Sequence, residues 1–323
     1  MKLTIHDIAK AAGVSTGTVS RALNGRSGVN PQTRQRILEL VQRLGYVPDV
    51  GARRLARGAT SVIGITRYAD TSLRNPYYTL LVDAIQAALV GSGYGVRILG
   101  SDAELEHGEF VGVIVAGVRL EDTRLEYLKS RSQMPHGQTP FVAISAGDGD
   151  VASVELDNRA GMLEVIAYLA AKGHQKIAHM TGHPIGRDAQ ARLEAYREGL
   201  QAAGLEFQMV LDGGFTELGA YRAMQRAVRD GVKFTALTCA SDEMALGAML
   251  ALEDGGKRVP QDMAVTGFDD LPLESFSIAQ LTTVHQPLLE IGRTAALLLL
   301  EQLAGQAPRS VIFTPRLIVR QTA

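Results

Sequence analysis

The chain has 323 residues, of which 46% are hydrophobic and 21% charged, and its net charge is −1 at pH 7. This length suits two or three domains with a large core. The lone cysteine, Cys239, excludes an intramolecular disulfide and fits a reducing cytoplasm. No apolar run reaches membrane-spanning length and no secretory signal pattern opens the chain, so we expect a cytoplasmic protein.

The charge is distributed unevenly. Residues 1–60 contain ten Lys and Arg against three Asp and Glu, a net charge of +7, whereas the remainder carries −8. A basic head on an acidic body indicates that only the head meets a polyanion.

Residues 3–24 have the pattern of two short helices joined by a glycine turn. Thr4 is a good N-cap with Asp7 at the capping-box position, Gly13 can end the first helix in a left-handed conformation, and Ser15 can cap the second. The second helix keeps small, polar or cationic residues on its outer face: Thr16, Gly17, Thr18, Ser20 and Arg21.

Such a face suits contact with phosphates and base edges, so the pattern predicts a DNA-reading helix-turn-helix. The alternative is an ordinary helical hairpin in a small core. Asn30 and Pro31 then begin a third helix that runs to about Leu44. We therefore expect a three-helix DNA-binding domain over 1–47, in which Asn24, just after the second helix, also contacts DNA.

Residues 48–59 form the expected hinge. Arg53, Arg54 and Arg57 surround the apolar Leu55, and the helix is too short to be stable alone. One interpretation is a basic linker. The other is a segment that folds on DNA and inserts Leu55 into the minor groove.

From residue 62 onward, short apolar runs alternate with amphipathic helices in two successive series. This order predicts an α/β core, 60–323, of two lobes with doubly wound parallel sheets. The expected strands are 62–65, 96–99, 113–116, 141–144, 153–155, 176–180, 209–211, 236–239, 264–267 and 282–284. The expected helices are 77–89, 160–172, 192–203, 217–230, 242–254 and 288–303.

The chain resembles the LacI/GalR family of transcription regulators along nearly its whole length. The residues that carry the resemblance are TIHDIA at 4–9, GVS at 13–15, TVSRALN at 18–24, LGYVP at 44–48, ARRL at 52–55, NPYY at 75–78, DN at 157–158, KGH at 172–174, ARL at 191–193, SDEMA at 241–245, GFDD at 267–270 and LTTV at 281–284. Their shared order and spacing are specific, although each motif alone is weak.

The resemblance implies a periplasmic-binding-protein-like core in which the chain crosses between lobes three times. The N-lobe would comprise about 60–155 and 285–312, and the C-lobe about 156–284 and 313–323. It also implies a homodimer that binds pseudo-palindromic operator DNA and changes its DNA affinity when a small molecule closes the cleft. We expect a dimer because the family's tetramerising helix has no counterpart after Arg320.

The resemblance also places effector-binding residues. Arg192 would bind hydroxyls or an anion from the start of a C-lobe helix, Asp269 would accept hydroxyl protons, and Phe215 would stack on a ring. The remaining candidates are Tyr68, Ser145, Asp157, Ser241 and Gln286. The alternatives are that Asp269 belongs only to a turn and that Phe215 is a core residue.

These residues suit a repressor controlled by a sugar. A purine, nucleoside or phosphosugar co-repressor is the alternative, and a sugar-binding transport component is a distant one that the basic head disfavours. No cofactor or metal is expected, because His174, His179 and His183 lack the spacing and companions of a metal set. No enzyme motif is present.

Two departures from the family pattern stand out. Gly17, at a variable position of the reading helix, has no side chain with which to read a base. Residues 100–111 replace a full helix between two strands, and predict a short loop with at most one helical turn. Such a loop leaves part of one sheet face bare, to be covered by a partner subunit or by the long loop at 132–139.

Overall fold

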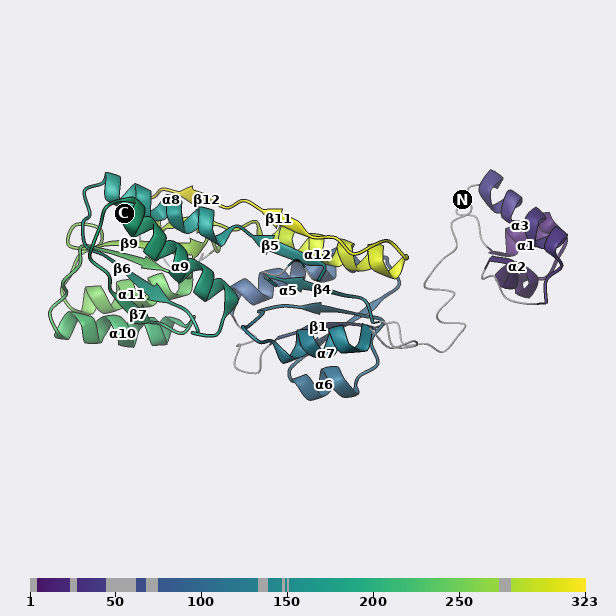
Figure 1. The fold of residues 1–323 in the computed structure, drawn as a ribbon, viewed down its shortest axis with the longest axis horizontal. Coiled ribbons are helices and arrows are strands. Elements are labelled where there is room, and N and C mark those ends of the chain that lie inside the picture. The colour runs from purple at the N-terminus through teal and green to yellow at the C-terminus, as the bar shows by residue number, and fades with distance from the viewer. Residues whose placement is uncertain are drawn as a thin grey trace. The chain divides into compact units, whose positions relative to one another are not determined.

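The computed structural model describes residues 5–23, 28–44, 62–67, 75–132, 139–146, 149, 151–272 and 280–323. The chain divides into two compact units, Met1–Ser61 and Val62–Ala323 (Figure 1). Several sites predicted from the sequence lie outside the described residues: Thr4, Asn24, Arg53, Arg54, Leu55, Arg57 and Tyr68.

The smaller unit contains helices α1 (Ile5–Ala12), α2 (Thr16–Leu23) and α3 (Pro31–Leu44). The apolar residues that recur at helical spacing meet in one small core, whose fully buried members are Ile8, Val19 and Ile37. Gly13 adopts a φ of 65° between α1 and α2, a conformation that glycine reaches without a steric penalty. This is the predicted helix-turn-helix.

Within the described residues the larger unit holds two six-stranded sheets. The first has the order β11 (Val311–Phe313), β5 (Ser153–Leu156), β4 (Phe141–Ile144), β3 (Gly112–Val115), β1 (Val62–Thr66) and β2 (Gly95–Leu99). The second has the order β12 (Arg316–Ile318), β10 (Thr282–His285), β9 (Ala264–Asp269), β8 (Ala236–Cys239), β6 (Ile177–Thr181) and β7 (Val210–Asp212). All pairs are parallel except the pair between β10 and β12.

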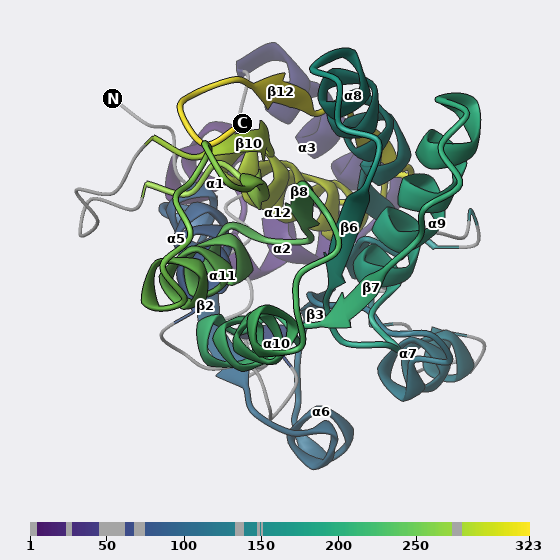
Figure 2. The same ribbon diagram turned by 90° about the vertical axis from the view of Figure 1, so that its left-hand side faces the viewer.

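Helices cover both faces of each sheet, as the buried parallel strands require. In the first lobe, α5 (Pro76–Leu89) and α12 (Leu288–Leu303) pack on one face, and α6 (Asp102–His107) and α7 (Thr123–Ser132) lie on the other. In the second, α8 (Asn158–Ala171) and α9 (Arg187–Ala202) lie opposite α10 (Glu217–Arg229) and α11 (Asp242–Asp254) (Figure 2). The predicted doubly wound α/β core is confirmed.

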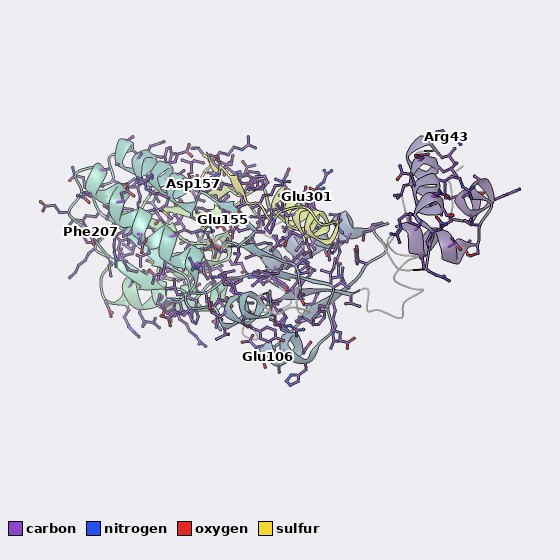
Figure 3. The ribbon with its side chains drawn as sticks, turned by 45° about the vertical axis from the view of Figure 1, so that its right-hand side comes forward. Arg43, Glu106, Glu155, Asp157, Phe207 and Glu301 are labelled. Carbon is purple, nitrogen blue, oxygen red and sulfur yellow. The ribbon has the colours of Figure 1, made fainter. Side chains whose placement is uncertain are left out.

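The lobes share chain segments, because α12 and β11 return to the first lobe and β12 ends in the second. One apolar core is continuous through both, from Ile63 in β1 to Phe268 in β9. Asp157 follows Glu155 where the chain passes from β5 into α8 (Figure 3), and its carboxylate accepts the Ala160 N–H at 2.9 Å. Asp157 is thereby the N-cap of α8.

The crossover after β2 differs from the prediction. Residues 102–107 form the six-residue helix α6, which is longer than one turn, and Leu105 within it is buried. Phe110 packs on the same face of the sheet: a Cβ on Gly64 would lie 3.2 Å from its ring. The expected bare face was therefore wrong there, because a short helix and one aromatic ring fill the place of a full helix. Residues 133–138 of the loop suggested as a cover lie outside the described part.

Replacing Phe110 by Ala is expected to destabilise the first lobe by about 2 kcal/mol, since a half-buried ring leaves a cavity over Gly64. The melting temperature measured by circular dichroism checks this. Val90→Ala, which shortens a side chain that is 82% exposed, is the control and should leave the melting temperature unchanged. Equal melting temperatures for the two variants would show that the ring does not support the sheet.

Candidate functional site

The outer face of α2 begins at a capped helix end. Ser15 Oγ accepts the Thr18 N–H at 3.1 Å and lies 2.9 Å from Thr18 Oγ1. Gly17 and Arg21 are exposed, and Thr16, Thr18 and Ser20 are partly exposed. The helix therefore presents a polar face with one cation, as contact with DNA requires.

The third helix holds this hairpin from behind. Arg36 Nη2 donates to the Ala12 carbonyl at 2.8 Å, at the end of α1. Orphaned carbonyls at a helix end need such partners. The bond ties α3 to the turn that precedes the reading helix, so α1, α2 and α3 form one support.

Arg192 lies at the centre of a polar cluster in the larger unit and is 3% exposed. Its Nε donates to Asn158 Oδ1 at 2.7 Å, its Nη1 donates to the Ala240 carbonyl at 2.5 Å, and its guanidinium lies 3.7 Å from the centre of the Phe268 ring. The expectation that Arg192 begins a helix was wrong: α9 starts at Arg187, and Arg192 lies in its second turn.

Asp269 ends β9 and faces Arg192, with Oδ1 4.0 Å from Arg192 Nη1. Gln286 Nε2 donates to the same oxygen at 2.5 Å, so the chain brings Arg192, Asp269 and Gln286 together. Burial, and then the neighbouring Asp242 carboxylate, raise the pKa of Asp269 well above its usual value. Asp269 also has a φ of 141°, a strained conformation of the kind found at functional sites.

The adjacent Asp270 has a different role. Its carboxylate accepts from Arg320 Nη2 at 2.6 Å and lies 2.9 Å from His285 Nδ1. These partners hold the corner after β9. The two successive aspartates thus have different roles, since Asp270 orders the turn while Asp269 faces Arg192.

Sequence reasoning missed three members of the cluster. Asn158 Nδ2 donates to Asp188 Oδ1 at 2.7 Å, and Asn158 thus links Asp188 to Arg192. Tyr77 reaches the cluster from α5 in the first lobe: burial, and then the carboxylates of Asp188 and Asp269, raise its pKa. The motifs at 75–78 and 157–158 contained two of these residues, but only their tertiary neighbours single them out.

The remaining candidates hold local structure. Ser241 Oγ accepts the Met244 N–H at 3.3 Å and caps α11, as Asp157 caps α8. Ser145 follows β4 and is buried, with a φ of 65°. Phe215 has a φ of 56°, and its ring lies so close to Gly182 that any Cβ there would clash.

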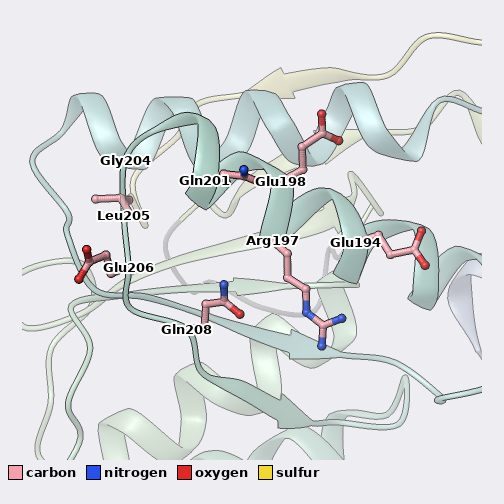
Figure 4. Close-up of a pocket in the computed structure, with 8 residues that line it drawn as sticks. All are labelled: Glu194, Arg197, Glu198, Gln201, Gly204, Leu205, Glu206 and Gln208. Carbon is pink, nitrogen blue, oxygen red and sulfur yellow. The ribbon is translucent and has the colours of Figure 1, made fainter.

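Other features of the described residues give weaker indications of a functional site. Among the described residues no three His, Cys, Asp or Glu gather to hold a metal, and no helix is long and apolar enough to cross a membrane. A surface hollow of about 610 Å³ lies beside α9 (Figure 4) and is lined by Glu194, Arg197, Glu198, Gln201, Gly204, Leu205, Glu206 and Gln208. It contains none of the clustered residues, and Glu198 is already paired with Arg159.

The fold and cluster define a class of protein, a helix-turn-helix unit joined to a two-lobed ligand-binding core. Residues 4–49 match the model of bacterial regulatory proteins of the lacI family, and residues 166–323 match the periplasmic binding protein-like domain. The chain is 34% identical to the HTH-type transcriptional regulator MalR of Streptomyces coelicolor, over 99% of this chain and 96% of that one. It is 30% identical to the HTH-type transcriptional regulator CelR of Thermobifida fusca, over 99% of this chain and 98% of that one.

Solved structures agree. A complex of the regulator CelR with cellobiose superposes with a TM-score of 0.73 at 28% identity, covering 99% of this chain and 100% of that one. The Lac repressor dimer bound to operator and the anti-inducer ONPF superposes with a TM-score of 0.73 at 26% identity, covering 100% of this chain and 99% of that one. The chain belongs to the lacI family, and it is a DNA-binding transcriptional regulator rather than an enzyme.

Proposed function

We propose that the protein is a cytoplasmic homodimeric repressor that binds a pseudo-palindromic operator and releases it when a sugar binds the core. The observation that carries the ligand-binding part is the cluster of the buried residues Arg192, Asp269 and Gln286 with the partly buried Asp188. Buried polar groups that converge from several elements are the mark of a ligand site. Relatives of the chain include a regulator solved with cellobiose, which supports a sugar.

We assign the domains as expected from the sequence. Residues 1–47 read DNA through Thr16, Thr18, Ser20 and Arg21, residues 48–59 form the hinge, and residues 60–323 bind the effector and dimerise. Two copies held by the dimer read two half-sites. Because operator and effector favour different lobe arrangements, their binding is reciprocally coupled.

The charges favour a neutral ligand over a phosphosugar. The contacts in the described part of the cluster join three carboxylates, on Asp188, Asp242 and Asp269, to the one guanidinium of Arg192. Burial raises the pKa of Asp242 to about 6, and a phosphate would add further negative charge beside these carboxylates. Within the described residues the hydrogen bonds of Arg192 use Nε and Nη1, and Nη1 is also the atom that faces Asp269, so Nη2 can donate to a sugar hydroxyl.

A purine is the second candidate, because relatives at 31% identity are named the repressor PurR. Phe215 would then stack on the base rather than on a sugar ring, and Asp269 would accept from its ring nitrogens. The polar cluster accommodates either ligand, so the choice of a sugar rests on the relative solved with cellobiose.

The test combines ligand screening with DNA binding by the full chain. Thermal shifts are measured with cellobiose, maltose, hypoxanthine and glucose 6-phosphate, and operator affinity is then measured with and without each compound. We expect a neutral sugar to raise the melting temperature and to weaken operator binding. A hypoxanthine response alone would establish the purine alternative, and failure of every compound to change DNA affinity would count against effector control.

A further inference from the structure

Two loops join the lobes through their backbones, outside the shared crossing segments. Leu120 N donates to the Ile185 carbonyl at 2.8 Å, and Arg187 N donates to the Val118 carbonyl at 3.2 Å. Between them Arg119 and Gly186 form an antiparallel bridge. We call these contacts, of 118–120 with 185–187, the inter-lobe bridge.

The first-lobe side of the bridge is held by a buried ion pair. Arg124 and Asp122 side chains are each 1% exposed and meet at 2.7 Å. Arg124 also donates to Thr66 Oγ1 at the end of β1 and to the carbonyls of Ala116 and Gly117 after β3.

These bonds occupy all five N–H donors of the Arg124 guanidinium, counting two to Asp122. Asp122 Oδ2 in turn accepts the Arg119 N–H at 3.0 Å. The loop is thus fixed to two strand ends before it meets the second lobe.

The second-lobe side of the bridge is the start of helix α9. Gly186 is the N-cap of α9 and offers no side chain to its first N–H groups. The Val118 carbonyl supplies an acceptor for the first of them, from Arg187. The helix that carries Asp188 and Arg192 is therefore capped by the other lobe.

We propose that the inter-lobe bridge is a positioning device, through which Val118 and Leu120 set the start of α9 and hence the placement of Asp188 and Arg192 for ligand. A change in the lobe arrangement reaches these two side chains directly, because the helix cap belongs to the opposite lobe. The inference rests on the proposed effector role of the Arg192 cluster, and it assigns no ligand contact to the bridge itself.

Arg187→Pro tests the bridge with little harm to α9. Proline is favoured at the first position of a helix, and Gly186, with φ −72° and ψ 128°, already has the backbone that a residue before proline requires. The substitution deletes only the N–H that donates to Val118, together with the Arg187 side chain. Arg187→Ala deletes the same side chain and keeps the N–H, and it is the matched control.

Hydrogen exchange is measured on the ligand-free full chain, and cellobiose affinity by calorimetry. In Arg187→Pro we expect the Leu120 amide to exchange faster than in Arg187→Ala, because the two bonds of the bridge support each other. We also expect cellobiose affinity to fall three- to tenfold, because Asp188 and Arg192 are no longer held for the ligand. The melting temperatures of the two variants should differ by no more than about 2–4 °C, since the variants differ by one hydrogen bond.

Equal Leu120 exchange in the two variants would overturn the proposal, as would equal cellobiose affinity when the wild type binds cellobiose. A wild type that binds no cellobiose contradicts the choice of sugar in the proposed function. The exchange measurement then still decides whether the two backbone bonds of the inter-lobe bridge support each other.

Discussion

Arg192→Met is expected to reduce effector affinity at least 100-fold and to abolish the effect of the effector on operator binding. Methionine preserves much of the side-chain length but none of the N–H donors. The variant loses the bonds to Asn158 Oδ1 and to the Ala240 carbonyl, and it leaves Asp269 buried without its cation. Breaking such buried charged contacts costs about 2–5 kcal/mol in binding.

The same variant is expected to lower the melting temperature, because an uncompensated buried charge destabilises a fold. That loss is moderated here since Asp269 is 4.0 Å from Arg192 and retains Gln286 as a donor. The raised pKa of Asp269 also lets the carboxyl take up a proton.

Calorimetry with whichever of the four screened compounds binds the wild type measures the affinity, and operator binding measures the response. Arg197→Met alters an exposed arginine of the same helix and should change neither. Arg192→Lys keeps the positive charge but loses the forked pair of N–H donors, so its effector affinity should lie between those of Arg192→Met and the wild type. Wild-type affinity in Arg192→Met would remove Arg192 from the ligand site.

Acidification from pH 6.5 towards pH 3 is expected to destabilise the second lobe through His179. The residue is fully buried, its Nδ1 lies 2.8 Å from Thr238 Oγ1, and its ring stacks on Tyr196. Its Nε2 has no hydrogen-bond partner among the residues that the structure describes. Burial, and then the Arg192 charge, lower the pKa of His179 to about 3.

The direction of the change in stability follows from the number of protons that the folded and unfolded chains bind. Between pH 6.5 and about 3 the unfolded chain holds a proton at this position that the folded chain does not, so stability is lost as the pH falls through that window. The contribution approaches 1.4 kcal/mol per pH unit, at about 25 °C. Asp242, whose pKa is raised to about 6, contributes with the opposite sign over part of the same range.

A comparison of variants separates the pH dependence that is due to His179 from the part that is due to Asp242. Melting temperatures of the wild type and His179→Phe are measured from pH 7 to pH 4. The phenylalanine keeps the stacking on Tyr196 and cannot be protonated, so its curve should be flatter than that of the wild type. His107→Phe, at an exposed position, should parallel the wild type. Parallel curves for all three proteins would show that His179 does not titrate as described.

Local sequence determined the helix-turn-helix and the alternation of strands and helices, because caps, glycine turns and hydrophobic periods act over a few residues. Ser15 illustrates this, since it was predicted to cap the second helix and its Oγ accepts the Thr18 N–H. The same locality explains one missed element. The polar helix α7 (Thr123–Ser132) shows only a weak period, and its buried residues Leu125 and Leu128 become a core face only beneath the first sheet.

Tertiary structure alone decided which polar residues meet. Asp157 and Ser241, which were predicted from the sequence to face the effector, are the N-caps of α8 and α11. Asn158, Asp188 and Tyr77 join the cluster from three different helices, and the inter-lobe bridge pairs loops more than 60 residues apart. Such contacts depend on how two sheets and their helices pack, and no short-range sequence pattern predicts contacts between residues so far apart in the chain. The sequence by itself determined the family and the chemistry of the two units, while the packing of the lobes decided how α9 presents Arg192.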